Sequence, residues 1–138
     1  MPIFLALKAE AYVKIGRGDI ALKTIDEALA IADETGERWA VAEVLRIRAG
    51  LLQTTGRATA GEIENILVKS LETGRRQQAL SWQLRIACDL AYLLQGQGRG
   101  AEAQPLLQSI YNQFTEGFDT TDLIYAKGLL DDLLANSG

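Results

Sequence analysis

The sequence predicts an all-α fold, a right-handed superhelix of three helix pairs followed by a C-terminal capping helix. Apolar residues recur at three- and four-residue spacings along nearly the whole chain, which is typical of helices that pack on one face. Alternating strand-like runs and Asn-Gly or Asp-Gly hairpin turns are missing. An internal repeat of 40–42 residues predicts that the helices form successive pairs, and 138 residues suit a single domain spanning 1–138.

Glycines and short polar turns divide the chain into seven expected helices, because they interrupt the apolar pattern at intervals of three or four helical turns. The expected helices span 2–15, 19–35, 39–55, 60–73, 77–96, 101–115 and 120–135. Between the third and fourth of them, Gly56 and Gly61 flank Thr59, which suits a helix end followed by a new N-cap. Pro105 falls inside the sixth span, so that helix is expected either to start late or to bend.

The small residues of successive helices align, and this alignment defines three repeats of about 2–38, 39–76 and 77–117. In the first helix of each pair, Ala9, Ala49 and Ala91 align, and each precedes a glycine by seven residues. The second helices align in the same way through Ala21, Ile25 and Ala28, then Ile63, Leu67 and Ser70, then Ala103, Leu107 and Ile110. Since two helices alone cannot bury their apolar faces, stacking of the three pairs is expected to create a continuous core.

The segment 119–135 is expected to cap the C-terminal end of the stack. Its start, DTTD at 119–122, offers capping oxygens and negative charge, and Phe114 and Phe118 are expected to seat the helix. One face carries Leu123, Ala126, Leu130 and Leu133. The N-terminal helix has no such cover, so the chain is either the tail of a longer protein or a homodimer joined through its N-terminal helices.

The composition excludes several classes of function. The chain has no histidine and one cysteine, so it has no imidazole base, no Ser-His-Asp triad, no Cys₄ metal site and no intrachain disulfide. The formal net charge of −4 offers no overall attraction for nucleic acid or an anionic membrane. We therefore expect a cytoplasmic protein that is not an enzyme and binds no metal or cofactor, no nucleic acid and no membrane.

A binding groove is expected on the concave surface, which the first helix of each stacked pair lines. The candidate groove residues flank the packed alanines and are Glu10, Lys14, Glu43, Arg46, Gln53, Arg85, Tyr92 and Gln95. Lys14, Arg46 and Arg85 suit a peptide carboxylate or acidic side chain, while an ordinary solvated face is the alternative. Arg46 and Tyr92 are the expected anchors. Cys88, with no histidine to activate it, is expected to be a small packed or groove-lining residue.

The placement of Ala9 and Tyr12 before Ala21, Ile25 and Ala28 resembles the tetratricopeptide repeat, although the period is longer than the ~34 residues usual in that family. The segments WAVAEVLRIRAGLL (39–52), SWQLR (81–85) and FTEGFDTTDL (114–123) look like the C-terminal repeats of bacterial predicted ATPases, which are often joined to an adenylate/guanylate cyclase domain. This resemblance covers about 39–135. Trp39 and Trp82 occupy equivalent positions and are expected to pack within the repeats.

The resemblance implies a non-catalytic protein-interaction or sensor module, the C-terminal part of a larger bacterial ATPase- or cyclase-linked regulator. Its partner would be a protein, a peptide, another domain of the same chain or a small effector bound on the concave face. The alternative is a stand-alone scaffold that associates with itself through its open N-terminal edge.

Overall fold

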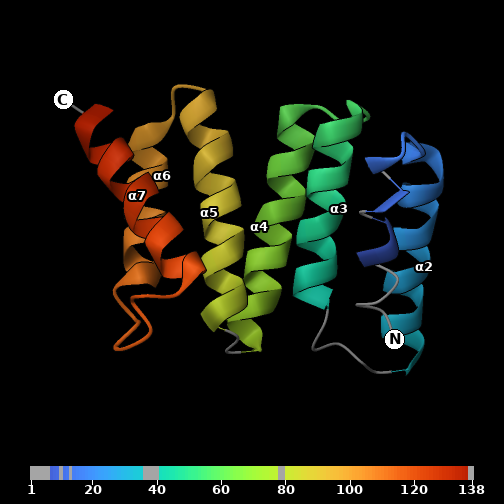
Figure 1. Cartoon of the computed structure of the whole chain (residues 1–138), viewed down its shortest axis with the longest axis horizontal. Helices are drawn as coiled ribbons and strands as arrows, with labels where there is room; N and C mark the ends of the chain where they lie inside the picture. The colour runs from blue at the N-terminus through green and yellow to red at the C-terminus, as the bar shows by residue number, and fades with distance from the viewer. Residues whose placement is uncertain (1–6, 10, 13, 36–40, 78–79, 137–138) are drawn as a thin grey trace. The chain divides into compact units, whose positions relative to one another are not determined.

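The computed structural model describes residues 7–9, 11–12, 14–35, 41–77 and 80–136, and over these residues the chain is helical with short turns and no strand. The predicted all-α class is therefore confirmed (Figure 1). The helices are α2 (Gly18–Thr35), α3 (Val41–Thr55), α4 (Ala60–Arg76), α5 (Leu80–Gly96), α6 (Gly100–Tyr111) and α7 (Thr121–Asn136), and residues 7–9, 11–12 and 14 before them are also helical. The chain divides into two compact units, Met1–Gln77 and Gln78–Gly138. The superhelical stacking of all three pairs stays a prediction.

Two helices differ from their expected bounds at the C-terminal end. α4 continues through Gly74 to Arg76, where an end near residue 73 was expected. Arg75 and Arg76 place positive charge in its last turn, which stabilises the negative end of the helix dipole and favours continuation past the buried glycine. α6 ends at Tyr111 and not near 115, because the next backbone N–H groups, those of Gln113 and Phe114, bond to carbonyls three residues back, at Ile110 and Tyr111, and no longer four.

Pro105 neither delays nor ends α6, so the expected late start of this helix is wrong. The helix begins at Gly100 and includes Pro105. The carbonyl that would have accepted a hydrogen bond from residue 105 belongs to Ala101, which is exposed. Water can therefore satisfy the group that the proline leaves without its helical partner.

The same helix-ending turn occurs three times, at the glycines that the sequence alignment matches. Gly16, Gly56 and Gly98 have φ angles of 79°, 67° and 75°, a left-handed conformation that glycine adopts without steric cost. Each is followed by an arginine whose backbone N–H reaches back five residues: Arg17 to Tyr12 (2.8 Å), Arg57 to Leu52 (3.1 Å) and Arg99 to Leu94 (2.8 Å). This is the hydrogen bond of a Schellman motif, so the sequence repeat is a repeat of structure at these turns.

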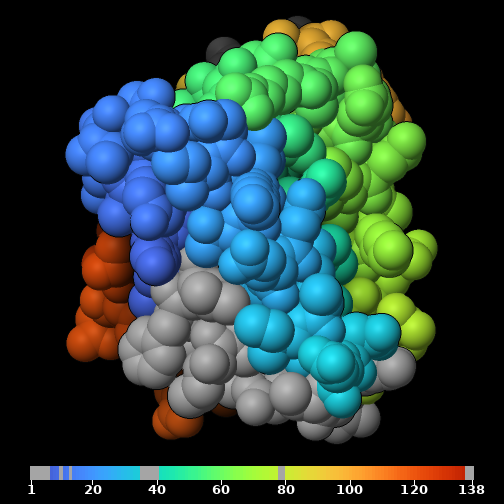
Figure 2. Space-filling view, turned by 90° about the vertical axis from the view of Figure 1, so that its right-hand side faces the viewer, coloured from blue at the N-terminus to red at the C-terminus, as the bar shows by residue number. Residues whose placement is uncertain are grey.

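In the N-terminal unit, α2 is antiparallel to α3 and α3 to α4, and Figure 2 shows the beginning of α2 beside the end of α3. The small residues predicted to pack are buried here. The core cluster consists of Ala9, Ala21, Ile25, Ala28, Val44, Ile47 and Leu51. Ser70 of α4 is fully buried and its hydroxyl donates a hydrogen bond of 2.5 Å to the carbonyl of Ala42 in α3.

The start of α4 has the cap expected at Thr59. The Thr59 hydroxyl accepts a hydrogen bond from the backbone N–H of Glu62, and the Glu62 carboxylate accepts one from the Thr59 N–H, both at 3.2 Å. This reciprocal pair is a capping box, which satisfies backbone donors that the helix itself leaves free. The predicted helix start is therefore confirmed.

In the C-terminal unit, α5 and α7 run in the same direction, with α6 antiparallel to them (Figure 1). The predicted apolar face of α7 is buried, as Leu123, Ala126, Leu130 and Leu133 show. The Thr120 hydroxyl accepts a hydrogen bond of 3.4 Å from the Leu123 N–H at the start of α7. The Phe118 ring lies 5.9 Å from that of Tyr111, tilted by 53°, and this contact holds the turn before α7 against the end of α6.

None of the described helices is both long and apolar enough to cross a membrane.

Candidate functional site

In the N-terminal unit, two of the expected groove residues bind each other. On α3, the Arg46 guanidinium contacts the Glu43 carboxylate through Nη2 and Oε1 at 2.6 Å and through Nε and Oε2 at 3.2 Å. The Glu43 side chain is only 7% exposed. Arg46 therefore neutralises an internal carboxylate, and a ligand anion at this position would compete with that pairing.

Of the other groove candidates of this unit, the structure describes Lys14 and Gln53. Lys14 and Gln53 are exposed. Glu10 falls outside the described residues, as does Trp39. The N-terminal unit as a whole carries eleven basic and eleven acidic residues, so it has no net charge that would favour one sign of ligand.

In the C-terminal unit, the expected groove residue Arg85 is held by the capping helix. Its Nε lies 2.9 Å from Oδ2 of Asp122, an ion pair that joins α5 to α7 with both side chains partly exposed. Two turns further along α5, Tyr92 is 62% exposed. Gln95, the last groove candidate, is half-buried one turn beyond it. The structure thus places the three candidates on one stretch of α5.

The neighbouring helix contributes an aromatic residue that the sequence analysis missed. Tyr125 of α7 lies one turn after Asp122 and is 52% exposed. Since Asp122 pairs with Arg85 and the two helices run in the same direction, Tyr125 stands beside α5 at the level of Cys88 and Asp89. We call the surface made by Arg85, Asp89, Tyr92, Asp122 and Tyr125 the α5–α7 face.

Two groups at this face, the Cys88 thiol and the Tyr125 phenol, have raised pKa values and so hold their protons more tightly than usual. Burial raises the pKa of the Cys88 thiol to about 12, and the carboxylates of Asp89 and Asp122 contribute to the rise. The pKa of Tyr125 is also raised, first by partial burial and then by Cys88, Asp89 and Tyr92. Cys88 is buried, so the expectation of a packed residue is confirmed. A protonated, buried thiol is a poor nucleophile, and the face suits binding more than covalent chemistry.

The C-terminal unit is acidic. It has three basic and seven acidic residues, which give a formal charge of −4, the whole net charge of the chain. On the α5–α7 face, Arg85 and Asp122 pair with each other, and the half-buried Asp89 is a second carboxylate. A partner with basic side chains is therefore favoured there over an acidic one.

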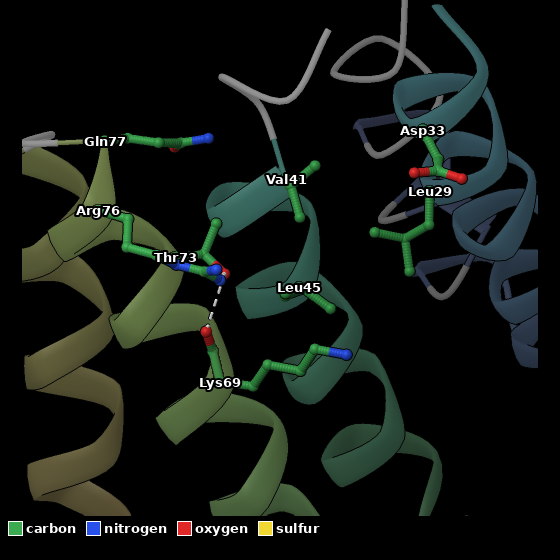
Figure 3. A pocket seen from close by; sticks show the side chains of 8 residues that line it. All are labelled: Leu29, Asp33, Val41, Leu45, Lys69, Thr73, Arg76 and Gln77. Carbon is green, nitrogen blue, oxygen red and sulfur yellow. Dashed lines mark hydrogen bonds between the residues drawn. The ribbon is translucent and has the colours of Figure 1, made fainter. Parts of the chain in front are cut away.

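A pocket of about 600 Å³ opens in the N-terminal unit, and none of the described groove candidates lines it. It is lined from three helices, as Figure 3 shows: Leu29 and Asp33 from α2, Val41 and Leu45 from α3, and Lys69, Thr73, Arg76 and Gln77 from α4. Each of these residues looks like an ordinary core or solvated position in its own helix. Only the packing of the three helices brings them together, so no local signal predicts the pocket.

Among the described residues, no three Cys, Asp or Glu side chains are grouped so that they could hold a metal ion. No protein-family model matches the chain and no curated protein matches it, so the resemblance to the tetratricopeptide repeat rests on the residues that carry it.

Proposed function

We propose that the chain is a non-catalytic protein-interaction module and that a partner segment docks on the α5–α7 face. The observation that carries this proposal is the pair of exposed tyrosines on neighbouring helices, Tyr92 and Tyr125. Tyrosine is enriched among residues that dominate binding energy, because its ring buries a large area and freezes few rotatable bonds. The Arg85–Asp122 ion pair supports the face by holding α7 beside α5.

The charge of the unit indicates the chemistry of the partner. Lysine or arginine side chains are attracted to an acidic surface and bind the faces of tyrosine rings through the cation–π interaction. The α5–α7 face offers two such rings next to Asp89 in a unit of net charge −4. We therefore expect the docked segment to carry lysine or arginine beside apolar residues.

Selection from a random peptide display library tests the proposal. Peptides that bind the whole chain should be enriched in lysine and arginine, and Tyr92→Ala and Tyr125→Ala should each weaken their binding by about tenfold, the usual effect of losing a central interface residue. The matched control is Ile124→Ala, an exposed residue next to Tyr125 whose side chain points about 100° away around the helix. Acidic selected peptides, or unchanged binding in both tyrosine variants, would contradict the proposal.

Self-association through the N-terminal helices is the second candidate function. Two apolar residues near this end of the chain, Leu7 and Ile15, are exposed. Apolar surface of this kind is stabilised when a second copy covers it. Light scattering should then show a dimer whose fraction rises with concentration and falls in Leu7→Glu and Ile15→Glu, but not in the control Val68→Glu, which alters another exposed apolar residue. A monomer at every concentration would contradict this candidate.

The resemblance to regulator repeats adds a cellular context to the proposal. In that context the module is the C-terminal part of a bacterial ATPase- or cyclase-linked regulator and works in the cytoplasm, where its single thiol stays reduced. The DNA upstream of the reading frame tests this context. An in-frame ATPase or cyclase domain supports it, and a stop codon directly upstream contradicts it.

A further inference from the structure

The pocket between α2, α3 and α4 combines an apolar lining with a polar rim. Leu45 is buried, and Leu29 and Val41 are half-buried, so aliphatic surface from two helices faces the pocket. The polar side chains come mainly from α4, with Asp33 contributed by α2 (Figure 3). A volume of about 600 Å³ is within the range of pockets that hold drug-sized molecules.

The charges at the rim favour an anion. Lys69 and Arg76 are exposed, and within the described part of the chain neither forms an ion pair with a carboxylate. The Arg76 guanidinium makes one long hydrogen bond, 3.4 Å from Nη2 to the hydroxyl of Thr73. That hydroxyl in turn donates to the Lys69 carbonyl at 3.0 Å, which anchors Thr73 within α4. Among the described residues that line the pocket, two are cations, Lys69 and Arg76, and one is a carboxylate, Asp33.

We propose that this pocket binds a small amphiphilic anion, a carboxylate or sulfonate attached to an apolar body. The apolar body would lie against Leu29, Val41 and Leu45, since burial of its surface supplies most of the affinity. The anionic group would pair with Lys69 and Arg76, which adds selectivity against cations. The site belongs to the N-terminal unit, so it is independent of the α5–α7 face and would let the module respond to a small molecule.

Fluorescence of 8-anilinonaphthalene-1-sulfonate, an aromatic sulfonate that becomes bright in apolar surroundings, tests the proposal on the whole chain. We expect saturable binding that Lys69→Gln and Arg76→Gln each weaken by about two- to fivefold, the range for partly solvated ion pairs. The matched control is Arg75→Gln, which removes the same charge from the adjacent, exposed position that does not line the pocket. Equal weakening by Arg75→Gln, or no saturable binding, would overturn the proposal.

Competition experiments identify the chemical class of the ligand, and NMR spectroscopy identifies the residues that bind it. Decanoate should displace the dye, while decyltrimethylammonium, with the same chain and the opposite charge, should not. Amide shifts in ¹H–¹⁵N spectra with decanoate should concentrate at the pocket-lining residues of α2, α3 and α4. Displacement by the cation, shifts confined to other residues, or stronger displacement by an acetylated tripeptide ending in leucine would overturn the assignment of a small amphiphilic anion.

Discussion

Arg46 holds the buried carboxylate of Glu43 through two of its nitrogens, one turn apart on α3. Arg46→Ala removes this partner from a side chain that is 7% exposed, so it should lower the free energy of unfolding by about 1–3 kcal/mol, the range for lost hydrogen bonds to a charged group. Arg46→Lys should recover part of the loss, since a single ammonium cannot form the two-point contact. Urea unfolding measures both.

The control for this prediction lies on the same helix. Arg48 pairs with Asp26 of α2 at 3.1 Å, and the Asp26 side chain is 60% exposed, compared with 7% for Glu43. Arg48→Ala should cost less than about 1 kcal/mol, because solvent weakens an exposed ion pair. If Arg46→Ala and Arg48→Ala lower the free energy of unfolding equally, the burial of Glu43 does not make its ion pair more stabilising than the exposed one.

The close approach of α2 to α3 depends on Gly18. A Cβ atom at this position would lie 2.7 Å from the Cγ2 methyl of Thr55, well inside contact distance. Thr55 cannot easily rotate the methyl away, because its hydroxyl donates a hydrogen bond of 2.7 Å to the Leu51 carbonyl. Gly18→Ala should therefore destabilise the protein by about 1–2 kcal/mol, although alanine is the better helix former.

A second substitution separates this clash from other effects of the alanine. Thr55→Ser removes the methyl and keeps the hydroxyl, so the double variant with Gly18→Ala should regain most of the lost stability. Thermal unfolding of the two single variants and the double variant measures the coupling. If Gly18→Ala is neutral or stabilising beside the native Thr55, the proposed contact does not limit the packing.

Ser70 provides a polar contact inside the apolar core of the N-terminal unit. Its hydroxyl is fully buried and bonds the Ala42 carbonyl, which links α4 to α3. Ser70→Ala should cost about 0.5–1.5 kcal/mol, the usual net contribution of one hydrogen bond. Ser70→Val should cost more, since it also adds volume to a filled site. Chemical denaturation measures both, and an unchanged midpoint in Ser70→Ala would contradict the role given to this contact.

Local signals predicted the helices and their turns well. Gly56 and Thr59 mark a helix end and a cap through chemistry that acts within a few residues, and the structure places both there. Gly74 shows the limit of such signals. Glycine often ends a helix, but α4 continues past Gly74 to Arg76, with two arginines in its last turn. Alignment of small residues predicted the core because repeats bury equivalent positions.

The candidate site was less predictable, because it depends on contacts between helices. The sequence pattern of α3 predicted that Glu43 lines a groove. In the structure the Glu43 side chain is buried and pairs with Arg46. In the sequence, Tyr125 looks like an ordinary residue on the polar face of a capping helix. Its position next to α5 becomes evident only from the Arg85–Asp122 ion pair, which joins α7 to α5. The pocket near Lys69 draws on three helices, and no pattern within one helix describes a space between several.

The raised pKa of Cys88 predicts a protected thiol. With a pKa of about 12 in place of 9.0, the folded protein holds about a thousandfold less thiolate at pH 8 than an unfolded chain, because each pKa unit is a factor of ten. Since Cys88 is the only cysteine, iodoacetamide labelling followed by mass spectrometry reports on it alone. Labelling should be slow in buffer and fast in concentrated urea. Rapid labelling of the folded chain would contradict the assigned burial.

The same shift predicts how stability depends on pH. The folded state keeps the Cys88 proton more tightly than the unfolded state, so its contribution to stability is complete below pH 9 and declines as the pH rises towards 12. Tyrosines and lysines also titrate in this range, so the comparison is with Cys88→Ala. The difference in unfolding free energy between the native chain and Cys88→Ala should shrink from pH 8 to pH 11, and a constant difference would show that the thiol titrates alike in both states.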